Sequence, residues 1–127
     1  MTPEPPLLPM GDATPAPRSA TIAVVIGCAL GVLFAMPALL AAFISSGAGH
    51  GHYVAARALF PGSMLLTLVE GSIGTVSIAV GLLQFPVYGG LLGWTIARKR
   101  YLPALVAASA HMVAALVCFS GVLPSFS

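Results

Sequence analysis

One histidine lies where a polar side chain is costly, and it is the first candidate for chemistry. His111 stands near the middle of the apolar run 102–123 (LPALVAASAHMVAALVCFSGVL). Ionisable residues inside a membrane need an internal partner, and they commonly mark proton relays, metal or haem ligands, or substrate contacts. The alternative is one interhelical hydrogen bond, for which Gln84 in the preceding apolar run is the natural partner. We take His111 and Gln84 as a candidate intramembrane polar site.

A second pair of imidazoles lies in a polar loop. His50 and His52 form an HGH sequence within residues 45–52 (SSGAGHGH), and imidazoles at this spacing could bind zinc or copper. A closed site needs about four ligands, and no Cys, Asp or Glu lies nearby in the sequence. The simpler interpretation is two solvated loop histidines, so we expect no metal or other cofactor.

The usual motifs of catalysis are missing from the sequence. There is no GxSxG, HExxH, CxxCH or Walker loop, and the three acidic residues (Glu4, Asp12 and Glu70) offer no pair placed to act together. Cys28 and Cys118 lie in apolar runs without CxxC spacing, which is typical of buried thiols rather than of a disulfide or metal pair. The sequence favours a protein that is not an enzyme.

The composition identifies the class of protein that carries these residues. Of 127 residues, 58% are hydrophobic and 6% are charged, with a mean hydropathy of +1.02. A soluble globular chain carries about 25% charged residues, and a soluble chain this short could not bury so much apolar surface. A formal charge of +2 is too sparse for a nucleic-acid-binding face. We predict an all-α integral membrane protein.

Four apolar segments are candidate spans. Because a helix rises about 1.5 Å per residue, about 20 residues cross a hydrocarbon core of roughly 30 Å. Residues 1–19 hold six of the eleven prolines and are predicted to be a disordered tail, followed by one transmembrane domain over 20–127. We predict a bundle of four transmembrane helices over residues 20–44, 53–70, 75–97 and 102–123.

The segment 53–70 is the shortest of the four. Twelve residues separate Arg57 from Glu70, and Pro61-Gly62 invites a break in the helix. The alternative fold therefore has three spans and a re-entrant or interfacial helix at 53–70. Because the two charges fall near the ends of the segment, as in a true span, we prefer four spans with both termini outside.

Basic and aromatic residues predict the orientation. The basic cluster 98–100 should be cytoplasmic by the positive-inside rule, which leaves the C-terminus outside a multi-pass membrane protein of the bacterial inner-membrane type. Long basic stems and aromatic rings also anchor helix ends among the headgroups. The expected interface anchors are Arg57, Trp94, Arg98, Lys99, Arg100 and Tyr101.

Small residues recur at a spacing of four. Gly27 and Gly31 form one such pair, and Gly89 and Gly93 form another. Such pairs let two helix backbones approach closely, which supplies attraction where lipid removes the hydrophobic drive. We interpret the four glycines as packing within the chain; the alternative is docking to a partner or to a second copy.

Three classes of function follow from these features. The leading one is a non-catalytic accessory or assembly component of a larger membrane complex, whose contacts are the bilayer and a membrane-protein partner or a second copy. The second is a transport or channel element, with a pathway lined by Gln84, His111, Thr67 and Ser109. The third is a membrane redox or metal-binding protein that uses His111 and the HGH loop.

Overall fold

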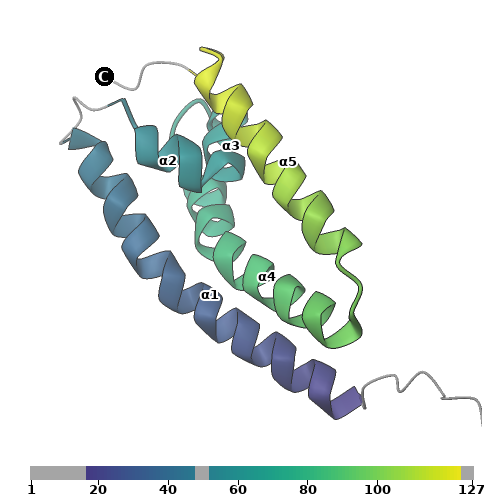
Figure 1. Cartoon of the computed structure of the whole chain (residues 1–127). Helices are drawn as coiled ribbons and strands as arrows, with labels where there is room; N and C mark the ends of the chain where they lie inside the picture. Colours follow the sequence, from purple (N-terminus) through teal and green to yellow (C-terminus); the bar gives the residue numbers. More distant parts are fainter. Residues whose placement is uncertain (1–16, 48–51, 124–127) are drawn as a thin grey trace, which may run out of the picture.

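The computed structural model describes residues 17–47 and 52–123, and within them the chain is helical without strands (Figure 1). Three helices are long and apolar enough to span a membrane, over Arg18–Ser45, Thr75–Arg98 and Leu102–Phe119. The predicted all-helical class is confirmed, and these helices suggest a membrane protein. The elements are α1 (Pro17–Ser45), α2 (Val54–Leu59), α3 (Pro61–Glu70), α4 (Thr75–Arg98) and α5 (Leu102–Phe119).

The ends of the helices differ slightly from the predicted spans. The helix α1 begins at Pro17, inside the predicted tail, because proline at the first helical position needs no backbone donor. The rest of that tail, residues 1–16, lies outside the described residues. The helix α5 ends at Phe119, ahead of Gly121, whose φ of +86° lies in the left-handed region.

The segment 53–70 is not one continuous helix. Phe60 adopts a non-helical conformation (φ −127°, ψ 48°) between α2, of 6 residues, and α3, of 10 residues. Pro61 begins α3 and has no N–H group with which to continue the hydrogen bonds of α2. At about 1.5 Å per residue neither piece crosses a 30 Å core. The predicted fourth span is therefore not confirmed.

The two short helices form a hairpin at one end of the bundle. The chain enters this α2–α3 hairpin (Val54–Glu70) near the end of α1 and leaves it next to the start of α4 (Figure 1). The tip at Phe60 packs edge-to-face against Phe85 of α4, with ring centroids 5.2 Å apart. Phe85 lies near the middle of α4, so the hairpin reaches about halfway along that helix.

The helices α1 and α4 pack closely through the predicted glycine pairs. A Cβ atom added to Gly27 would lie 2.1 Å from the carbonyl oxygen of Gly89, and one added to Gly31 would lie 2.2 Å from that of Phe85. A Cβ atom on Gly93 would lie 2.1 Å from the carbonyl oxygen of Ala23. Only glycine permits this backbone contact, so all four glycines serve packing within the chain.

Most large apolar side chains face outward. Leu33 is 68% exposed and Phe43 is 78% exposed, whereas the residues buried deepest include the polar Thr67, Ser77 and Thr95. A soluble protein would place these residues the other way round. The pattern fits a protein whose outer surface meets lipid.

Candidate functional site

The candidate polar residues converge on the end of α2. A helix leaves its last carbonyl groups without partners, and inside a membrane no water replaces them. The Gln84 side chain donates from Nε2 to the Leu59 carbonyl oxygen at 2.7 Å. His111 Nε2 lies 3.0 Å from the Ala58 carbonyl oxygen. Gln84 and His111 thus cap successive carbonyl groups of α2, from α4 and α5 respectively, in place of the predicted hydrogen bond between them.

Two contacts orient the ring of His111. A carbonyl oxygen only accepts hydrogen bonds, so Nε2 carries the proton that it donates to Ala58. The other nitrogen, Nδ1, lies within hydrogen-bond distance of the Tyr88 hydroxyl, at 3.3 Å. The two rings also meet edge-to-face, with centroids 5.6 Å apart. Both ring nitrogens of His111 are therefore engaged, and the ring is held in one orientation.

Two further side chains bond the backbone around the break. The Cys118 thiol donates to the Pro61 carbonyl oxygen at 3.5 Å, and the Ser63 hydroxyl donates to the Ser77 carbonyl oxygen at 2.5 Å. Sequence reasoning missed these roles and that of Tyr88. Of the three, only the role of Tyr88 could have been predicted, because Tyr88 follows Gln84 by four residues and therefore lies on the same face of the helix.

Glu70 joins the hairpin to α4. Its carboxylate accepts hydrogen bonds from the Ser77 hydroxyl, from the Ser77 N–H at 2.9 Å and from the Val76 N–H at 3.2 Å. The N–H groups at the start of a helix lack partners within the helix, and they favour a negative charge. The hydrogen bonds from the Ser77 hydroxyl and then the Ser77 N–H lower the pKa of Glu70. Glu70 thus caps α4 as an anion.

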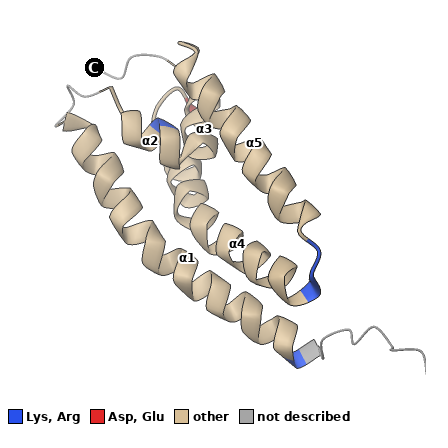
Figure 2. Cartoon of the chain, viewed as in Figure 1, with Lys and Arg blue, Asp and Glu red and all other residues tan. Residues whose placement is uncertain are grey.

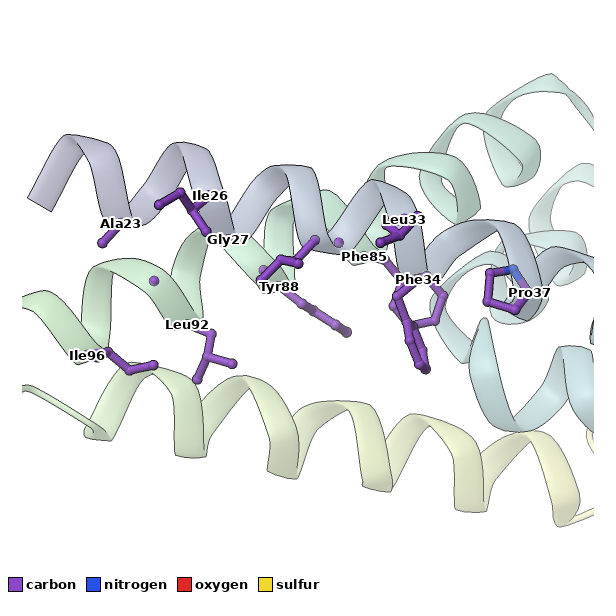
Figure 3. Close-up of a pocket in the computed structure, with 14 residues that line it drawn as sticks. Ala23, Ile26, Gly27, Leu33, Phe34, Pro37, Phe85, Tyr88, Leu92 and Ile96 are labelled. Carbon is purple, nitrogen blue, oxygen red and sulfur yellow. The ribbon is translucent and has the colours of Figure 1, made fainter.

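An apolar groove lies beside this polar cluster. A cavity of about 820 Å³ is bounded by α1 and α4, and one of about 400 Å³ by α4 and α5. Phe85, Tyr88 and Leu92 of α4 line both cavities. In Figure 3, the side chains of Phe34, Tyr88 and Leu92 point into the cavity that α1 and α4 bound. We call the two cavities together the α1–α5 groove, since no described Cα atom of α1 lies within 8 Å of one in α5.

The predicted basic anchors lie at one end of the bundle, apart from Arg57. Figure 2 shows basic residues at the start of α1 and at the α4–α5 turn, on the same end, and Arg57 near the other. The side chains at that basic end are exposed: Arg18, Arg98, Lys99, Arg100 and Tyr101. Trp94 is half-buried. Arg57 is half-buried, and its Nε has no hydrogen-bond partner among the described residues. The basic end comprises Arg18, Arg98, Lys99 and Arg100.

Only one of the two candidate metal ligands, His52, lies in the part of the chain that the structure describes. His50 lies outside the described residues, and His52 is exposed. Within residues 17–47 and 52–123, no three His, Cys, Asp or Glu side chains gather where they could hold a metal ion.

The polar cluster and the apolar groove lie side by side. The polar side chains of the cluster satisfy the backbone of the hairpin, and the groove beside them is walled by apolar side chains. Comparison with protein-family models, curated proteins and solved structures finds no match to this chain.

Proposed function

We propose that this protein is a non-catalytic accessory component of a membrane, and that it holds an apolar molecule taken from the bilayer in the α1–α5 groove. The observation that carries the proposal is the groove itself, with its two adjoining cavities of about 820 and 400 Å³. Ligand sites are concave and mainly apolar, with a few polar groups that fix orientation. Tyr88 and His111 are the polar side chains at this one.

The topology that we propose has three spans. The helices α1, α4 and α5 cross the membrane, and the α2–α3 hairpin is re-entrant, entering and leaving from one side. Support comes from the break at Phe60 and from the hydrogen bonds that cap α2 at mid-bundle. The basic end then faces the cytoplasm by the positive-inside rule. Both the N-terminus and the α4–α5 turn lie inside, and the C-terminus lies outside.

The engagement of the polar residues argues against a transport pathway. Gln84 and His111 are bonded to the end of α2, and the Thr67 hydroxyl donates to the Met64 carbonyl oxygen of its own helix at 2.6 Å. Ser109 is exposed on α5. A polar pathway needs such groups to be free and to face one another. The four residues considered for a pathway do not meet that requirement.

The groove can be tested with a neutral alkyl diazirine that dissolves in bilayers and inserts into nearby bonds when illuminated. Leu92 lines the groove and Leu83 does not, although the two leucines are 52% and 61% exposed on the same helix. We expect adducts at Leu92 to exceed those at Leu83 several-fold in vesicles containing the full-length protein. Equal labelling would mean that the groove holds no apolar guest, and the proposal would fail.

The matched variants are Leu92→Trp, which fills the groove, and Leu83→Trp, which adds the same bulk outside it. The adducts are read at Leu30, on the α1 wall of the groove. We expect Leu92→Trp to reduce labelling there and Leu83→Trp to leave it unchanged.

A further inference from the structure

The groove has the length of one leaflet rather than of the whole bilayer. It runs along α4 from Phe85 to Ile96, about 17 Å at 1.5 Å per residue, and along α1 from Ala23 to Pro37, about 21 Å, so both walls are shorter than a full hydrocarbon core. Half of a hydrocarbon core of roughly 30 Å is about 15 Å. At the Phe85 end Phe60 of the hairpin and Phe34 of α1 pack edge-to-face on the same ring, each with its centroid 5.2 Å away. The Phe85 end of the groove therefore lies beside the tip of the hairpin, near mid-bundle.

This length separates two kinds of occupant. A transmembrane helix of a partner protein needs about 20 residues to cross the core. It would meet the α2–α3 hairpin halfway along its path. An acyl chain of one leaflet ends where the groove ends. The glycine faces that could have paired with a second copy of the chain are already used between α1 and α4.

The open end of the groove carries positive charge. Ile96 and Ala23 line this end, and Arg98 follows Ile96 by two residues. Arg18, Lys99 and Arg100 lie at the same end of the bundle (Figure 2), and their side chains are exposed. The single carboxylate among the described residues, Glu70, lies at the opposite end, bonded to the start of α4. An apolar groove that leads to a cluster of cations matches an anionic lipid.

We propose that the α1–α5 groove binds one anionic phospholipid from the leaflet at the basic end, with an acyl chain in the groove and its phosphate paired with the basic residues. This inference rests on the proposed function and adds the class of the guest. The acyl chain contacts Leu92 and Ile96. Its end meets the aromatic cluster formed by Phe34, Phe85 and Phe60. Arginine and lysine at the rim supply the charge selectivity.

Native mass spectrometry of the full-length protein in mild detergent tests the inference. The probes are phosphatidylglycerol, which is anionic, and phosphatidylcholine with the same acyl chains, which is zwitterionic. We expect the protein to retain one phosphatidylglycerol several-fold better than one phosphatidylcholine. Replacing residues 98–100 with glutamine should remove this preference. Arg57→Gln, at the other end of the bundle, is the matched control and should keep it.

Groove-filling variants show whether the acyl chain is inside. Leu92→Trp and, on the opposite wall, Leu30→Trp should lower retention of phosphatidylglycerol several-fold. Leu83→Trp should not. The leucines replaced are 52%, 59% and 61% exposed, respectively, so each substitution adds bulk at the surface rather than in a packed core. Unchanged retention in both groove variants would mean that the lipid binds by its headgroup alone, which overturns the inference.

The two proposals fail in different ways. If diazirine labelling favours Leu92 over Leu83 while both phospholipids are retained equally, the anionic guest is wrong and the apolar site stands. If labelling is equal at the two leucines, the site itself is wrong and the lipid inference falls with it.

Discussion

Gly27 is the residue on which the pairing of α1 and α4 depends most directly. An alanine Cβ there would lie 2.1 Å from a backbone oxygen, which cannot move without shifting a helix. We expect Gly27→Ala to lower the free energy of unfolding by about 1–3 kcal/mol, as overpacked cores do. This free energy can be measured by unfolding the protein with an SDS titration in mixed micelles. The control is Gly62→Ala, where the nearest side-chain atom would be 3.8 Å away and no loss is expected.

Gln84 is a structural residue whose loss should cost more than that of an average intramembrane hydrogen bond. In Gln84→Leu the half-buried Leu59 carbonyl oxygen loses its side-chain donor. An unsatisfied buried acceptor costs about 1–3 kcal/mol, so we expect a loss of that size in the same SDS titration. Tyr88→Phe leaves the bond from His111 to Ala58 in place, and should cost about 0.6 kcal/mol, the average for membrane proteins. Equal losses in the two variants would contradict the capping role of Gln84.

At the scale of elements, the cap of α4 should make stability depend on pH. The pKa of Glu70 is lowered in the folded protein, so its ionised form contributes stability above the unfolded value of 4.5. That contribution is lost as the pH falls through the lower, folded pKa. We expect wild type to lose thermal stability over this acid range and Glu70→Gln to be less stable at neutral pH with a flatter profile. A steep acid loss that persists in Glu70→Gln would assign the titration to another group.

The long elements could be predicted from the sequence and the short ones could not. Charge-free runs of at least 18 residues have few alternatives to a spanning helix, so α1, α4 and α5 follow from composition and length. The hairpin depends on how Pro61 is accommodated, because the freed carbonyl groups need donors from other helices. The sequence singles out both donors, Gln84 and His111, as polar residues within apolar runs. It does not reveal that both bond the carbonyl groups at the end of α2, because that depends on where the hairpin ends relative to α4 and α5.

At the scale of the whole molecule, the hairpin and the groove have one cause. The α2–α3 hairpin reaches only to Phe85, near the middle of α4, and no described Cα atom of α1 lies within 8 Å of one in α5. A continuous fourth helix would fill both halves of the space beside α4 and leave no groove. The aromatic contacts of Phe60 and Phe34 with Phe85 therefore lie where the hairpin turns and where the groove begins. The topology of residues 53–70 is thus the property on which the proposed function depends most.

Cysteine labelling in intact cells can distinguish the two topologies. In a background without native cysteines (Cys28→Ala and Cys118→Ala), single cysteines are placed at His52 and at Ser72, before and after the hairpin. A re-entrant hairpin returns to the side from which it entered, so we expect an impermeant thiol reagent to label both positions from outside. Tyr101→Cys, at the basic end, should react only after the membrane is permeabilised. With four spans and both termini outside, Ser72→Cys would react in intact cells and His52→Cys would be protected, because a full crossing separates them.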